Sequence, residues 1–176
     1  MIKGLKICGI SDSQTLSYIL NHAYPPKYIG FITNYEKSKR FVTYEKLKDL
    51  INVDKKQVNF VSVLVNPTNE VLKKIADLKF DYYQLYDVNP IRTLEIKKKY
   101  KVKIISALTI SDKDDVNKFK DYSEISDIIL FDSKGYHKSE SFDHNLLNEV
   151  PKKLNKMIAG NIQIDDIPNF KNKDFI

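Results

Sequence analysis

Short runs of consecutive apolar residues alternate with longer amphipathic segments along almost the whole chain, and this alternation leaves few folds open to it. Polar residues bound each run, and the apolar positions within it are consecutive rather than alternate. Strands buried on both faces of a parallel sheet have this pattern. We therefore predict seven strands, at residues 5–8, 28–32, 58–65, 82–85, 102–107, 127–131 and 156–159.

The segments between these runs carry apolar residues at the spacing of an amphipathic helix. Residues that favour the start of a helix precede them. The predicted start signals are Ser11 with Gln14, Thr43, Asn66 with Pro67, Asn89 with Pro90, and Ser111. Strands that alternate with helices in this way predict an α/β fold with a parallel sheet.

Two α/β architectures fit the pattern, an open doubly wound sheet and a (β/α)8 TIM barrel. Neither GxGxxG nor GxxxxGK[ST] follows the first predicted strand, so the sequence does not favour an open sheet that binds nucleotides. A barrel places functional residues at the ends of several different strands, as the candidates below are placed. The seven predicted strands leave the last β/α unit of a barrel missing, although Phe175 and Ile176 could begin an eighth strand. No linker divides the chain, so we expect one domain over residues 1–176.

The charge of the chain does not favour nucleic-acid binding. The formal net charge is +6, but the excess is nearly all lysine, and Arg40 and Arg92 are the only arginines. Proteins that read bases depend on arginine for two-point contacts. The scattered lysines therefore predict a solvated surface, which would still attract a small anionic metabolite.

The sequence indicates neither a membrane segment nor secretion. No stretch approaches the ~20 apolar residues that span a bilayer, and the first residues lack the apolar core of a signal peptide. We therefore expect a cytoplasmic protein. The single cysteine, Cys8, cannot form an internal disulfide. We expect no metal site, because the spacing of the three histidines from Cys8 is not that of metal ligands; these are His22, His137 and His144.

Cys8 ends the first predicted strand and is followed by Gly9 and a predicted helix start. One interpretation is a small buried apolar side chain. The other is a reactive thiol, because backbone N–H groups and the positive end of a helix dipole can stabilise a thiolate as base or nucleophile.

Polar residues also lie at the ends of other predicted strands. Asp132 follows a run of four apolar residues, and it is either a helix cap or a general acid. Arg40 lies in a long connection after the second strand, and it is either a surface charge or a ligand for a carboxylate or phosphate. Gln84 in the fourth strand and Gly160 after the seventh are weaker candidates.

An ordered set of motifs resembles the phosphoribosylanthranilate isomerase family of tryptophan biosynthesis. The matching stretches are KICGI at 6–10, YIGFITN with SKRFV at 28–42, VSVLVN at 61–66, YYQLYD at 82–87, ILFDS at 129–133, SFDH at 141–144 and IAGNI at 158–162. These matches occur in the family's order over nearly the whole chain.

The resemblance implies a TIM barrel that catalyses an Amadori rearrangement without a cofactor. An aminoaldose phosphate, N-(5-phosphoribosyl)anthranilate, would become the aminoketose phosphate 1-(2-carboxyphenylamino)-1-deoxyribulose 5-phosphate. By the same resemblance, Cys8 would be the general base, Asp132 the general acid, and Arg40 the ligand of the anthranilate carboxylate. Gln84 and the pair Gly160–Asn161 would complete substrate binding.

The sequence also departs from the family at several positions. Tyr86 and Asp87 stand where the family has His–Gly, the stretch Tyr136 to Ser141 has no glycine, and Gly160–Asn161 replaces a double glycine. Glycine-rich turns hold phosphate through backbone N–H groups. Two alternatives follow: a non-catalytic relative that binds a ligand or partner, and a phosphosugar enzyme of a neighbouring barrel family with another substrate. We also expect a homo-oligomer or a completing segment at the open barrel edge.

Overall fold

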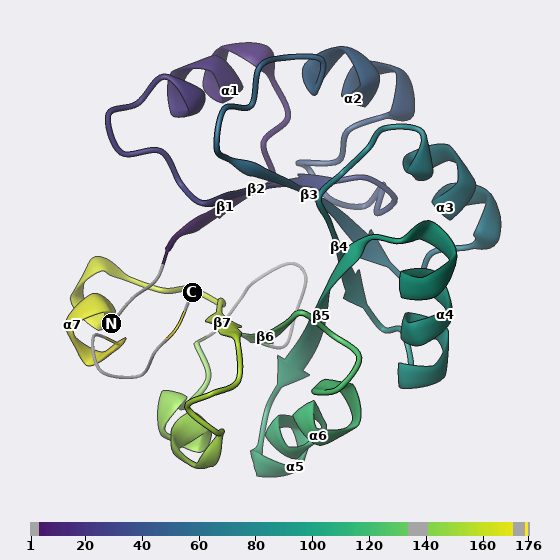
Figure 1. The fold of residues 1–176 in the computed structure, drawn as a ribbon. Helices are drawn as coiled ribbons and strands as arrows, with labels where there is room; N and C mark the ends of the chain where they lie inside the picture. Colours follow the sequence, from purple (N-terminus) through teal and green to yellow (C-terminus); the bar gives the residue numbers. More distant parts are fainter. Residues whose placement is uncertain (1–3, 134–140, 171–174, 176) are drawn as a thin grey trace.

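The strands form one curled parallel sheet. The computed structural model describes residues 4–133, 141–170 and 175. Within these residues the sheet has seven parallel strands, which neighbour one another in sequence order. Their bounds are β1 Lys6–Cys8, β2 Tyr28–Ile32, β3 Asn59–Val65, β4 Tyr82–Tyr86, β5 Lys103–Ile110, β6 Ile128–Ser133 and β7 Lys156–Ile158. Figure 1 shows β1 and β7 at the two ends of the curl, with helices on its outer side. The predicted barrel-type α/β fold is confirmed.

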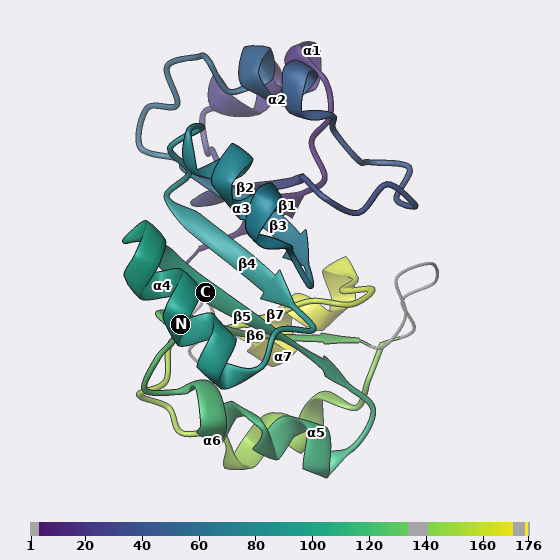
Figure 2. The ribbon, with the colours of Figure 1, turned by 90° about the vertical axis from the view of Figure 1, so that its right-hand side faces the viewer.

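Helices follow most strands and cover the outside of the sheet (Figures 1 and 2). Their bounds are α1 Ser13–Leu20, α2 Tyr44–Leu50, α3 Asn69–Ala76, α4 Pro90–Tyr100, α5 Lys113–Asn117, α6 Phe119–Tyr122 and α7 Ile167–Phe170, with the 3₁₀ helices η1 His144–Glu149 and η2 Ile164–Asp166. Within the described ranges, no helix has the length and apolar character needed to cross a membrane.

Three of the predicted helix caps are wrong. The side chains that accept a first-turn amide are Asp12, Thr68 and Asp112, each of which follows the predicted cap along the chain. An aspartate carboxylate is a stronger acceptor than the neighbouring serine hydroxyl. Asn66 has a positive φ of 39° and turns the chain out of β3 before the helix begins. The predicted caps Thr43 and Asn89 do precede α2 and α4.

Alternate residues of each strand face opposite sides of the curled sheet. On the outer face, buried side chains such as Phe31, Leu64 and Ile104 pack together with helix residues. On the inner face, Val61, Ile105 and Leu130 belong to a second cluster. All five residues of β2 and of β4 are buried, as expected for strands covered on both faces. This alternation decides which polar side chains reach the interior of the curl.

Two aspartates bind backbone amides of neighbouring strands near the amino ends of those strands. Asp81 precedes β4 and accepts a hydrogen bond from the backbone N–H of Phe60 at 2.7 Å, and Asp127 accepts one from Ile104 at 2.8 Å. Lys55 and Lys97 pair with these two carboxylates. These carboxylates thus stabilise the end of the sheet opposite the carboxyl ends, where barrel enzymes place their chemistry.

Phe175 lies beside the last strand. It forms a parallel bridge with Lys156, the first residue of β7, and its side chain is buried. This is the position at which an eighth strand would begin, as the sequence suggested for Phe175. The companion residue of that prediction, Ile176, lies outside the described residues.

Candidate active site

An open cavity of about 1030 Å³ occupies the inner side of the curl. Its lining includes the predicted site residues Cys8, Arg40, Gln84, Asp132 and Gly160. These residues come from distant parts of the chain and meet in one cavity only because the sheet curls. Asn161, the remaining predicted site residue, follows Gly160 and is exposed.

Cys8 is the last residue of β1, and its free thiol is half-buried. The expectation that nearby backbone N–H groups face this thiol is wrong for the two residues that follow it. The amides of Gly9 and Ile10 both donate to the carbonyl oxygen of Gly30, at 2.8 and 3.2 Å. The chain bends away from β1 while keeping its backbone tied to β2, which leaves Cys8 at the rim of the cavity.

Gly30, the partner of Cys8 on β2, provides space for the thiol. A Cβ at this position would lie 3.0 Å from the Sγ of Cys8 and 2.9 Å from the Nζ of Lys6. Any larger residue at position 30 would therefore press against the thiol, so glycine here keeps the Cys8 side chain at its position on the inner face.

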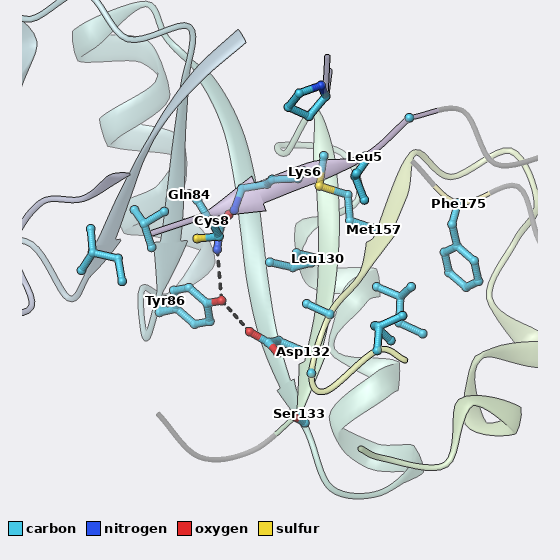
Figure 3. A pocket seen from close by; sticks show the side chains of 18 of the residues that line it. Leu5, Lys6, Cys8, Gln84, Tyr86, Leu130, Asp132, Ser133, Met157 and Phe175 are labelled. Carbon is cyan, nitrogen blue, oxygen red and sulfur yellow. Dashed lines mark hydrogen bonds between the residues drawn. The ribbon is translucent and has the colours of Figure 1, made fainter. Parts of the chain in front are cut away.

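Asp132 lies on β6, with its carboxylate on the inner face. It falls inside the strand rather than after it, because β6 continues to Ser133. The Tyr86 hydroxyl donates to its Oδ2 at 2.6 Å, and the Gln84 Nε2 donates to the Tyr86 hydroxyl at 3.0 Å. Figure 3 shows this chain of hydrogen bonds beside Cys8. Asp132 is thus anchored to β4.

Tyr86 also lines the cavity, although in the sequence it stands out only as a departure from the family. Its side chain is buried, and burial raises its pKa well above the ordinary value of 10.0. Negative charge on Asp132 and on Cys8 raises this pKa further. The predicted strand ended at Leu85, one residue too early. The alternation of 82, 84 and 86 on one face is the signal that could have found Tyr86.

Arg40 lies in the connection between β2 and α2 and lines the cavity. Its Nη1 donates to the backbone carbonyl of Cys8 at 3.1 Å. Gly9 has a φ of +86°, and a Cβ there would lie 2.5 Å from the Arg40 Cδ. The guanidinium therefore crosses directly over the turn that follows the thiol.

Gly160 turns the chain after β7. Its φ is +94°, and a Cβ would lie 2.3 Å from the Ser133 Oγ, so only glycine fits against the end of β6. Asn161 also has a positive φ, and its Oδ1 accepts a hydrogen bond from the Gln163 Nε2 at 2.8 Å. Of the stretch Tyr136 to Ser141, only Ser141 lies within the described residues.

Two buried polar atoms at the cavity lack a hydrogen-bond partner among the residues that the structure describes. The Oε1 of Gln84 and the Oγ of Ser133 make no hydrogen bond within the described part of the chain, although both residues line the cavity. Buried polar atoms without partners are rare in folded proteins, and a bound ligand is one way to satisfy them. Among the described residues, no group of three or more His, Cys, Asp or Glu is placed to hold a metal ion.

Comparison with known proteins identifies the family of this chain. The family model "N-(5'phosphoribosyl)anthranilate (PRA) isomerase" matches residues 5–176. The chain belongs to the PRA isomerase family. The PRA isomerase of Rhizobium rhizogenes is 30% identical over an alignment of 171 residues, which covers 92% of this chain and 76% of that protein.

Solved structures of PRA isomerases share the fold. The structure of the Thermotoga maritima enzyme matches with a TM-score of 0.80 and 24% identity, over 96% of this chain and 82% of that one. Another, in complex with reduced 1-(O-carboxyphenylamino)-1-deoxyribulose 5-phosphate, matches with a TM-score of 0.78 and 23% identity, over 96% and 80% of the two chains. At these identities the structural matches show the fold, and the family assignment depends on the sequence.

Proposed function

We propose that this chain is a PRA isomerase, which converts N-(5-phosphoribosyl)anthranilate to 1-(2-carboxyphenylamino)-1-deoxyribulose 5-phosphate in tryptophan biosynthesis. Family membership supports this reaction. The structural observation that carries the proposal is the meeting of Cys8 from β1 and Asp132 from β6 at one cavity. A proton donor and a proton acceptor on facing strands are what an aldose–ketose isomerisation needs.

The reaction begins with a proton transfer from Asp132. Its carboxyl group protonates the furanose ring oxygen, the bond between C1 and that oxygen breaks, and the nitrogen lone pair forms a C1=N bond. The Cys8 thiolate then takes the proton from C2, and the electrons of the C2–H bond form C1=C2 while the nitrogen is neutralised. The resulting enolamine tautomerises to the ketone. Each proton transfer by a positioned group supplies roughly 10²- to 10⁴-fold.

Other residues at the cavity hold the substrate. Arg40 offers a planar guanidinium to the anthranilate carboxylate, which suits the two-point geometry of this pair. Gln84 offers its unpaired Oε1 to a donor of the substrate, such as a hydroxyl or the bridging amine. The turn at Gly160 and Asn161 brings backbone N–H groups to the phosphate, as turns at strand ends do in other barrels.

The proposed substrate also indicates the compartment. A phosphosugar carries charge that is costly to move through a bilayer, so we propose that the enzyme works in the cytoplasm, where its substrate is made.

Turnover measurements on the unaltered chain and three variants test the function. We expect the chain to consume freshly generated phosphoribosylanthranilate, followed by the loss of its fluorescence, and we expect Cys8→Ala and Asp132→Asn to lose about 10²- to 10⁴-fold in kcat. Asp114→Asn removes the same charge on α5, away from the cavity, and should match the unaltered chain. Tight binding of the reduced product analogue without turnover would instead identify a non-catalytic relative.

A further proposal concerns what pairs with the open edge of the sheet. In the described part of the chain, β1 pairs with β2 and β7 pairs with β6, while Leu5, Ile162 and Ile167 expose apolar surface along the cavity between them. We propose that a completing strand pairs here, because Phe175 already lies beside Lys156. Sedimentation as a monomer would exclude a second copy of the chain as the cover, whereas a dimer would show that a second copy covers the edge and would overturn this proposal.

A further inference from the structure

A chain of hydrogen bonds links β4 to the proposed acid on β6. Gln84 and Tyr86 are alternate residues of one strand, so both side chains face the inside of the curl. The Gln84 Nε2 lies 3.0 Å from the Tyr86 hydroxyl, which lies 2.6 Å from the Asp132 Oδ2. Gln84 is 1% exposed and Tyr86 is 8% exposed, so water competes little for these contacts.

The direction of these hydrogen bonds follows from the chemistry of the groups. The Tyr86 hydroxyl carries one proton and donates it to the Oδ2 of Asp132, which accepts it both when the carboxyl group is ionised and when that group's own proton lies on the Oδ1. The hydroxyl oxygen then accepts from the amide of Gln84, which fixes that amide with its Nε2 toward Tyr86. The Oε1 of Gln84 is left without a hydrogen-bond partner among the described residues.

The hydroxyl of Tyr86 keeps its proton under all ordinary conditions. Burial is the main cause of its raised pKa, followed by the negative charge of Asp132. A phenol in this environment is a permanent neutral donor. It is suited to holding another group and unsuited to exchanging protons with the substrate.

We propose that Tyr86 is a positioning residue that holds the Oδ2 of Asp132 and reserves the Oδ1 for proton transfer to the substrate. The inference rests on the proposed function, because it assigns Tyr86 a part in the same isomerisation. With one oxygen engaged by a donor on β4, the carboxyl proton resides on the other oxygen. The carboxyl group is also kept from rotating, which maintains the alignment that a proton transfer needs.

The kinetic test compares two tyrosines of the same strand. Tyr86→Phe should lower kcat about 10- to 100-fold while KM changes less than about threefold, because alignment is lost and binding is not. Tyr83→Phe removes a hydroxyl from the outer face of β4, where Tyr83 packs in the helix-facing core, and it should leave both constants unchanged. Equal kcat for Tyr86→Phe and the unaltered chain would overturn the proposal.

A double-mutant cycle separates positioning from a general structural effect. In the Asp132→Asn background, Tyr86→Phe should change kcat less than about twofold, because the group that it positions has already lost its function. A loss that persists in full in this background would show that Tyr86 acts independently of Asp132, and this too would overturn the proposal.

A third measurement needs no catalysis. The hydroxyl proton of Tyr86, identified in NMR spectra by its loss in Tyr86→Phe, should move upfield in Asp132→Asn, since an amide oxygen is a weaker acceptor than a carboxylate. An unchanged resonance would show that the hydroxyl does not bind Asp132. If the unaltered chain lacks isomerase activity, the proposed function fails, and this resonance still decides whether Tyr86 holds Asp132.

Discussion

The guanidinium of Arg40 is hydrogen-bonded to the backbone of Cys8. Its Nη1 lies 3.1 Å from the Cys8 carbonyl oxygen, although the two residues are 32 positions apart in the sequence. The contact joins the loop after β2 to the end of β1. It holds the proposed carboxylate ligand next to the proposed base, so that substrate bound by Arg40 is presented to the thiol.

Arg40→Lys should weaken substrate binding. A lysine ammonium is a point charge and cannot donate to the Cys8 carbonyl and a carboxylate in the same planar arrangement. We expect KM to rise about tenfold, a loss of about 1.4 kcal/mol, with a smaller change in kcat. The matched control is Arg92→Lys, which alters the other arginine on the outer helix α4 and should change KM less than about twofold.

Gly160→Ala should destabilise the protein. The added Cβ would lie 2.3 Å from the Ser133 Oγ and 2.7 Å from the Ser133 backbone nitrogen, at a φ of +94°. We expect a loss of about 2–4 kcal/mol in the free energy of unfolding, measured by urea denaturation. Adding Ser133→Gly should recover only part of this loss, because the backbone contact and the strained φ remain. Complete recovery would contradict the assignment of strain to the backbone.

Asp127→Ala should lower stability without lowering activity. Its carboxylate binds the Ile104 amide at 2.8 Å and Lys97 at 2.9 Å, at the amino end of β6 and away from the cavity lining. We expect the free energy of unfolding to fall by about 1.5–3 kcal/mol, with kcat at 25 °C unchanged. Asp127→Asn keeps an acceptor for the amide and should lose less. A fall in kcat as large as that of Asp132→Asn would contradict the view that the amino ends of the strands serve stability and the carboxyl ends serve catalysis.

Buried tyrosines should make the protein sensitive to alkali. Burial raises the pKa of Tyr83 to about 12, from an ordinary value of 10.0. Above pH 10 the unfolded chain releases this proton while the folded chain retains it, so stability is full below pH 10 and falls as pH rises toward 12. The slope is at most about 1.4 kcal/mol per pH unit for this group.

Tyr83→Phe should reduce that slope. Unfolding free energies measured between pH 10 and 12 should fall less steeply in Tyr83→Phe than in the unaltered chain. Tyr18→Phe alters an exposed side chain on α1 and serves as the control. Equal slopes for Tyr83→Phe and the unaltered chain would show that the Tyr83 hydroxyl is not protected from solvent.

Some local features were predictable and others were not. Runs of consecutive apolar residues located the strands, because burial on both faces leaves few polar positions. Helix starts were less certain where two capping residues are adjacent, as at Ser11 and Asp12, since both side chains can accept the first amide. Tyr86 was not predicted as a site residue because the predicted strand ended one residue too early. A residue left outside the strand is not assigned to either face of the sheet.

The alternation of strands and helices can be read from the amino-acid pattern alone, which also places the thiol of Cys8 and the carboxylate of Asp132 at the ends of two apolar runs. The folded chain was needed to show that these groups share a cavity with Arg40, and that Tyr86 donates to a carboxylate 46 residues away. Residue spacing governs local hydrogen bonds and burial, whereas contacts across the curl depend on the register of every intervening strand.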